Sequence, residues 1–83
     1  MEVGKKIKEI RLLRGISQKE LSERLGVSSA MISQYESGKR NPKMETLLKI
    51  ADALGISINV FYENLSKDEY QNILEAKARK ADR

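Results

Sequence analysis

The 83-residue chain contains no cysteine and no histidine. It therefore has no disulfide framework and no thiolate metal site, and it lacks the commonest metal ligand and the usual acid–base group at neutral pH. No pair of carboxylates stands apart from ordinary helix-surface positions, so we expect no metal, no cofactor and no catalysis. The longest apolar run is three residues, which excludes a transmembrane helix or signal-peptide core and predicts a cytoplasmic protein.

Basic residues are concentrated in the first half of the chain. Residues 1–43 carry ten Lys and Arg against five Glu, whereas residues 44–83 carry six against seven Asp and Glu. This asymmetry favours an anionic partner, although lysines scattered over solvated helix faces have the same composition. Charge alone does not decide between these interpretations.

Helix-capping serines and helix-ending glycines recur at short intervals and strand alternation is absent, so we expect an all-α fold. This punctuation and the apolar spacing predict helices at 3–14, 18–25, about 29–37, 44–54 and 58–64. The third helix is capped by Ser28 or Ser29. The pattern SKDE at 66–69 has the form of a capping box and begins a sixth helix. The domain is expected to span 1–65, and a C-terminal helix with a frayed tail occupies 66–83.

The segment 44–54 shows the clearest helical periodicity, with apolar residues at the i, i+3, i+4, i+7 spacing of a buried face. The other predicted helices carry shorter apolar stripes, and Val27 can fill the corner between the second and third. The expected core consists of Val3, Ile7, Ile10, Leu21, Leu25, Ile32, Tyr35, Leu47, Ile50, Ala51, Leu54, Ile58, Phe61 and Leu65.

Two short helices joined by a tight turn at Gly26, with the basic loop KRNPK at 39–43 after the second, have the layout of a helix-turn-helix DNA reader. The sequence QKELSERLGVSSAMISQYES at 18–37 resembles the helix-turn-helix of the phage repressor/Cro (XRE-type) family. The resemblance extends over about residues 4–65. It implies a compact five-helix repressor-like domain whose third helix enters the major groove of DNA.

The resemblance also implies which residues contact DNA. The base-reading residues are Ser28, Ser29, Ala30, Ser33 and Gln34. The phosphate-contacting residues are Gln18, Lys39, Arg40 and Asn41; the alternatives are an ordinary first-turn residue for Gln18 and a solvated turn for the other three. Arg11 and Glu36 match a buried or half-buried ion pair between the first and third helices, although long charged side chains usually lie at the surface.

Several positions depart from the family's usual residues or leave alternatives open. Serines discriminate weakly among bases, so part of the specificity is expected to come from DNA shape. Ser22 replaces a frequent alanine, and its hydroxyl is expected to bond to the Gln18 carbonyl. Leu12 and Leu13 suggest additional burial beneath the C-terminal helix. Tyr35 is a core residue with its hydroxyl at the surface, where it either only packs or reaches a phosphate.

A domain of this size reads few base pairs, so we expect a homodimer on a pseudo-palindromic operator with half-sites about 34 Å apart. The resemblance places the dimer contact at 56–65, and Tyr70, Ile73 and Leu74 either extend it or fold back on their own core. The expected function is a transcriptional regulator that represses or autoregulates by occluding a promoter, with RNA polymerase contact if it activates. The alternative is an antitoxin or adaptor that uses the same fold for protein interaction.

Overall fold

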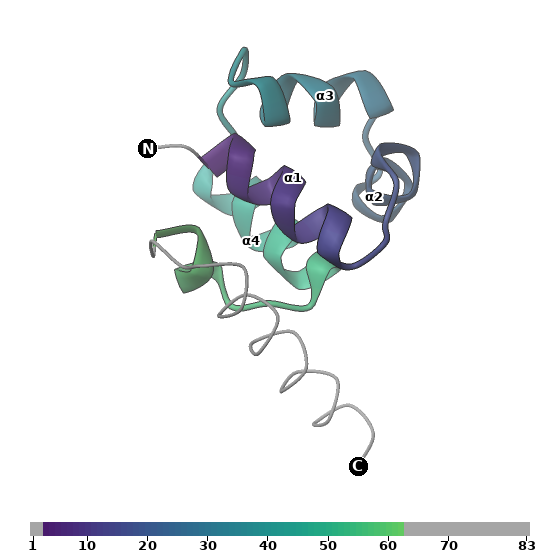
Figure 1. The fold of residues 1–83 in the computed structure, drawn as a ribbon. Helices are drawn as coiled ribbons and strands as arrows, with labels where there is room; N and C mark the ends of the chain where they lie inside the picture. Colours follow the sequence, from purple (N-terminus) through teal and green to yellow (C-terminus); the bar gives the residue numbers. More distant parts are fainter. Residues whose placement is uncertain (1–2, 63–83) are drawn as a thin grey trace.

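A computed structural model describes residues 3–62, and the expected C-terminal helix at 66–83 lies outside them. The described residues form four α-helices and a 3₁₀ helix, with no strand, so the predicted all-α fold is confirmed (Figure 1). The elements are α1 (Val3–Leu13), α2 (Gln18–Leu25), α3 (Ser29–Ser37), α4 (Met44–Leu54) and η1 (Ile58–Tyr62).

The bounds of α2, α3 and α4 match the predicted ones, whereas the end of α1 and the type of the fifth helix differ from the expectation. Helix α1 ends at Leu13, one residue before the predicted end. The fifth helix is predicted at 58–64 within an all-α fold. Its described part, Ile58–Tyr62, is a 3₁₀ helix, and residues 63 and 64 lie outside the described range. Ser57 explains this tighter winding, because its carbonyl accepts the Val60 N–H at 3.1 Å, the i to i+3 bond of a 3₁₀ turn.

Serine caps and a glycine turn set the two central helices. The Ser17 hydroxyl accepts the Glu20 N–H at 3.0 Å, and the Ser28 hydroxyl accepts the Met31 N–H at 3.1 Å. Ser28, and not Ser29, is therefore the cap of α3. Gly26 ends α2 with φ of 72°, a left-handed conformation that glycine adopts without steric cost. The chain consequently turns from α2 into α3 within three residues.

The core forms where α1 passes between α3 and α4 (Figure 1). Its completely or almost completely buried side chains are Ile7, Ile10, Leu21, Ile32, Ile50, Leu54 and Phe61, all of which were predicted. Leu25, Val27 and Ile58 are partly buried against them. The core also contains three residues that periodicity did not identify, namely Ile16, Ile56 and Val60.

Two predictions about individual side chains are wrong. The Ser22 hydroxyl donates to the carbonyl of Lys19 at 2.6 Å instead of Gln18, because the hydroxyl of a helical serine can reach the i−3 carbonyl as well as the i−4 carbonyl. Leu12 and Leu13 are 59% and 36% exposed, since the buried stripe of α1 passes through Ile10 and Arg11 and turns these next two positions outward. The C-terminal helix expected to cover them lies outside the described residues.

Gly4 lies where α1 closely approaches the end of α3. A Cβ atom at this position would run into the Tyr35 carbonyl oxygen and lie 2.8 Å from the Glu36 carbonyl oxygen. Both obstacles are backbone atoms, so no side-chain rotation can remove the conflict. Because Gly4 has no side chain, α1 can pack this closely against the end of α3.

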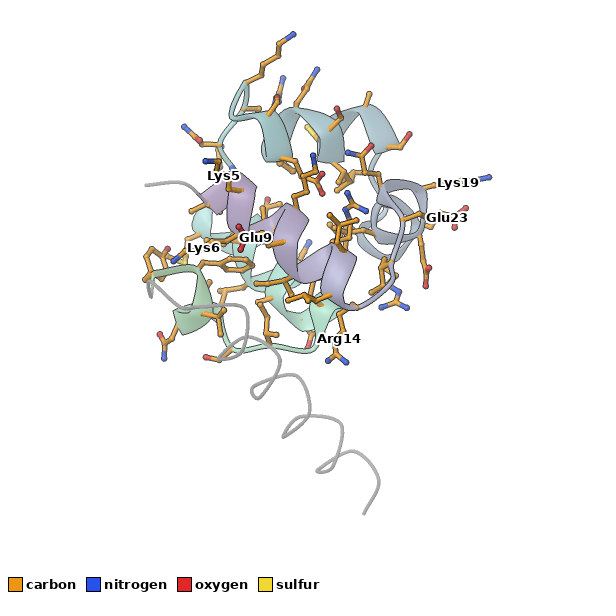
Figure 2. The ribbon with its side chains drawn as sticks, in the orientation of Figure 1. Lys5, Lys6, Glu9, Arg14, Lys19 and Glu23 are labelled. Atoms are coloured by element: carbon orange, nitrogen blue, oxygen red, sulfur yellow. The ribbon has the colours of Figure 1, made fainter. Side chains whose placement is uncertain are left out.

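Two arginines bind the C-terminal end of α4. Arg14, which directly follows α1 and is labelled in Figure 2, donates from Nε to the Leu54 carbonyl at 2.9 Å. Arg24 donates from Nη1 to the Ala53 carbonyl, also at 2.9 Å. The last carbonyls of a helix lack partners within the helix and form its negative end, so both cations stabilise α4 there. They also attach α4 to the α1–α2 part of the chain.

Candidate nucleic-acid interface

Helix α3 turns one side to the core and the other to solvent. Ile32 and Tyr35 are buried, at 0% and 8% exposure. The residues assigned to base reading lie elsewhere on the helix or at its start, where Ser28, Ser29, Ala30 and Ser33 are exposed and Gln34 is half-buried. Four of these five side chains are short, so another molecule can approach the backbone of α3 closely.

The loop after α3 is fastened to the end of that helix. The Arg40 N–H donates to the Gln34 carbonyl at 3.2 Å, and the Ser37 hydroxyl donates to the same carbonyl at 3.2 Å. The Ser37 hydroxyl also accepts the Lys39 N–H at 3.4 Å. These bonds hold the backbone of the basic loop against α3. The side chains of Lys39, Arg40 and Asn41 are exposed beside the C-terminal end of the exposed α3 face.

Arg11 and Glu36 form an ion pair between α1 and α3. The distances are 2.7 Å from Arg11 Nε to Glu36 Oε2 and 3.1 Å from Nη2 to Oε1, so the pair is bidentate. The side chains are only 8% and 4% exposed. Arg11 Nη1 also donates to the Ile16 carbonyl at 2.8 Å. One guanidinium thus holds both α3 and the loop that leads into α2.

Gln18, the first residue of α2, also bonds to Glu36. Its Nε2 donates to Glu36 Oε1 at 3.0 Å, and the residue is half-buried. Neighbouring positions on α2 face outward, as Lys19 and Glu23 show on the outer side of the helix in Figure 2. The structure therefore brings Gln18 into contact with the Arg11–Glu36 pair, a connection that the sequence analysis did not anticipate.

Tyr35 packs in the core and keeps its hydroxyl at the boundary with solvent. The residue is 8% exposed, and its hydroxyl makes no hydrogen bond within residues 3–62. Because no buried side-chain oxygen of the described chain lacks a partner, this hydroxyl is in contact with solvent. A phosphate contact and packing alone are both compatible with this position.

The described residues contain no cluster of three or more acidic, histidine or cysteine side chains that could hold a metal ion. Within the same residues, no helix is both long and apolar enough to cross a membrane. The described residues instead present an exposed face of α3 made of small side chains, with the basic loop 39–43 at one end and the start of α2 nearby.

Comparisons with known proteins agree with this geometry. Residues 7–61 match the family model described as helix-turn-helix. The chain is 38% identical to the HTH-type transcriptional regulator ImmR of Bacillus subtilis over 83% of its length. It is 34% identical to the cryptic phage CTXphi transcriptional repressor RstR of Vibrio cholerae over 89%, and 35% identical to the HTH-type transcriptional activator BcrR of Enterococcus faecalis over 95%.

The chain spans only part of the length of these relatives, 52% of ImmR, 66% of RstR and 37% of BcrR. The residues matched by the family model, 7–61, include α2, the turn, α3 and the basic loop, which carry the candidate interface. Members of the matched family are DNA-binding proteins and not enzymes. The chain belongs to the phage repressor/Cro (XRE-type) helix-turn-helix family.

Proposed function

We propose that this protein is a homodimeric, sequence-specific transcriptional regulator that places α3 in the major groove of a pseudo-palindromic operator. The observation that carries the proposal is the hydrogen bond from Arg40 N–H to the Gln34 carbonyl, which joins a basic loop to an exposed recognition helix. Helix α3 then contacts the base edges, and the adjoining basic loop contacts the flanking phosphates. Repression or autoregulation by promoter occlusion is the proposed outcome.

The proposed base contacts follow from the chemistry of the exposed α3 face. The Gln34 amide can pair with adenine through two hydrogen bonds, and the Ala30 methyl can contact a thymine methyl group. The hydroxyls of Ser29 and Ser33 donate or accept with several bases. Ser28 contributes less acceptor capacity, because its hydroxyl already accepts the Met31 N–H. Since serines discriminate weakly, DNA shape supplies part of the specificity.

The dimer is proposed to form near the end of the described chain. Within 56–62, Ile56, Val60 and Phe61 are buried in their own core and are not available to a second copy. Tyr62, at 48% exposure, is the exposed large apolar side chain of that segment, and Ile58 is only partly buried. A symmetric operator with half-sites about 34 Å apart is the DNA counterpart of such a dimer.

The relatives leave the sign of control open, because their names include both a repressor and an activator. Occlusion requires only that the bound dimer overlaps a promoter, so it needs no surface beyond the DNA interface. Activation would require a further contact with RNA polymerase. Repression is therefore the simpler proposal for the surface described above.

Replacing Arg40 by alanine is expected to weaken binding to all DNA sequences about equally. A lysine or arginine that contacts one phosphate contributes about 0.9 to the slope of log affinity against log salt concentration, so the slope should fall by about one. Gel shifts over a series of salt concentrations measure both effects. Lys49→Ala is the matched control, since it removes one exposed positive charge from α4 and should leave the slope unchanged.

This experiment also tests the proposed function as a whole. A DNA-binding regulator loses affinity steeply as salt increases. If the unaltered protein binds no duplex at low salt, the regulator proposal is wrong and the protein-interaction alternative, an antitoxin or adaptor, is favoured.

Replacing Gln34 by alanine is expected to relax the preference at a single base pair of each half-site. The loss of one bidentate contact costs roughly 1–3 kcal/mol of discrimination against the wrong base. Selection from a random duplex pool by both proteins measures the preference position by position. The same selected sequences report the symmetry and spacing expected of a dimer, and an unchanged preference at every position would remove Gln34 from the base-reading set.

A further inference from the structure

We infer that Glu36 is a positioning residue for DNA binding, because its carboxylate fixes the orientation of the Gln18 side-chain amide at the start of α2. This inference rests on the proposed function, in which Gln18 contacts a phosphate. The helix that carries the base-reading residues thereby also controls a phosphate contact made by the preceding helix. No DNA contact by Glu36 itself is required.

The chemistry of the contact fixes which way the Gln18 amide points. An ionised carboxylate only accepts hydrogen bonds, so the Gln18 atom 3.0 Å from Glu36 Oε1 is the amide nitrogen. The amide oxygen of Gln18 has no hydrogen-bond partner among residues 3–62. Since no buried side-chain oxygen of these residues is unpartnered, this oxygen is in contact with solvent.

This orientation determines what Gln18 can offer to DNA. A phosphate requires a donor, and Nε2 has a second hydrogen in addition to the one directed at Glu36. The Gln18 backbone N–H, at the first position of α2, has no acceptor within the helix. Both donors belong to a residue that Glu36 holds in place. If the amide rotated by half a turn, its oxygen would replace the donor and repel the phosphate.

Glu36 can hold the amide because it is itself held rigidly. Arg11 binds both carboxylate oxygens, at 2.7 and 3.1 Å, and the Glu36 side chain is only 4% exposed. The third bond of the guanidinium, to the Ile16 carbonyl at 2.8 Å, fixes the backbone two residues before Gln18. The side chain and the backbone of the α2 start are therefore positioned by the same buried pair.

A double-mutant cycle in DNA affinity tests the inference. The probe is a duplex that the unaltered protein selects from a random pool. Gln18→Leu should weaken binding about tenfold, the size of a hydrogen bond to a charged group. Glu36→Gln should weaken it about threefold or more in the presence of Gln18, since a neutral amide can accept either orientation, and by less than about twofold when Gln18 is already leucine.

A purely structural role for Glu36 gives a different result. Its substitution would then weaken binding by the same factor in both backgrounds, and that outcome overturns the inference. Arg40→Ala is the matched control, because Arg40 is a proposed phosphate contact with no bond to Glu36. Its effect and that of Glu36→Gln should multiply, with a deviation smaller than the coupling measured between Gln18 and Glu36.

A second measurement needs no substitution and applies even if Glu36→Gln does not fold. The two side-chain amide protons of Gln18 are followed by nuclear magnetic resonance in the free protein and on the selected duplex. We expect the proton bonded to Glu36 to keep its shift and slow exchange when DNA is added, while the other proton shifts. Loss of the Glu36 bond on DNA would mean that Glu36 competes with phosphate, which contradicts the inference. If the unaltered protein selects no duplex at all, the proposed DNA-binding function itself is wrong, whatever the role of Glu36.

Discussion

Replacing Arg11 by leucine is expected to lower the free energy of unfolding by about 3–5 kcal/mol. The substitution leaves the Glu36 carboxylate, 4% exposed, without its cationic partner, and the remaining bond from neutral Gln18 cannot compensate for the lost charge. It also removes the donor to the Ile16 carbonyl. Urea unfolding followed by circular dichroism measures the difference directly.

An exposed ion pair within the same domain provides the control. Arg24 and Glu20 lie 2.8 Å apart, but their side chains are 45% and 47% exposed. Glu20→Gln breaks this pair while keeping the backbone N–H that Ser17 caps, and it should cost at most about 1 kcal/mol. A loss of less than about 1 kcal/mol for Arg11→Leu would show that the Arg11–Glu36 pair is not effectively buried.

Replacing Gly4 by valine is expected to lower the free energy of unfolding by about 3 kcal/mol, the upper end of the usual cost of overpacking. The new Cβ meets two backbone oxygens of α3, so α1 and α3 must move apart and loosen the core between them. Gly4→Ala should also destabilise the fold, even though alanine is the better helix former, by up to about 1 kcal/mol in a helix interior and by less in the first turn, where Gly4 lies. Thermal and urea unfolding of both variants measure the effect.

The sign of the change in unfolding free energy for Gly4→Ala shows which contribution is larger, the clash with the α3 backbone or the higher helix propensity of alanine. A stabilised Gly4→Ala protein would mean that α3 yields easily and that helix propensity dominates. Lys8→Val in the same helix is the control, because Lys8 is exposed and the change should cost only about 0.5 kcal/mol of helix propensity.

Local signals in the sequence were sufficient for much of the fold. Helices α2 and α4 begin and end where they were predicted, because apolar spacing and a following glycine mark each one. Ile16, Ile56 and Val60 escaped prediction because they lie outside the regular helical stripes, in connections and in the 3₁₀ helix. Gly4 also escaped, since nothing in its own neighbourhood indicates that α3 passes so close.

Less of the candidate site than of the fold could be predicted from the individual residues. Composition indicated an anionic partner, but the assignment of Ser33, Gln34 and Arg40 depended on the family resemblance. The hydrogen bond from Gln18 to Glu36 joins residues 18 positions apart, on different helices. Periodicity within one helix cannot reveal such a bond, because it depends on how the two helices cross.

The arginine contacts with the end of α4 bear on how small this domain can be made. Arg24 finds its carbonyl acceptor 29 residues later in the chain, and Arg14 finds its own 40 residues later. A fragment that stopped after α3 would keep both cations and lose both acceptors, together with the buried face of α4. Helices as short as α2 and α3 are marginal in isolation. The α2–α3 pair is therefore not expected to fold when it is moved alone into another protein. A transfer of the proposed DNA specificity must carry the chain at least as far as Gly55.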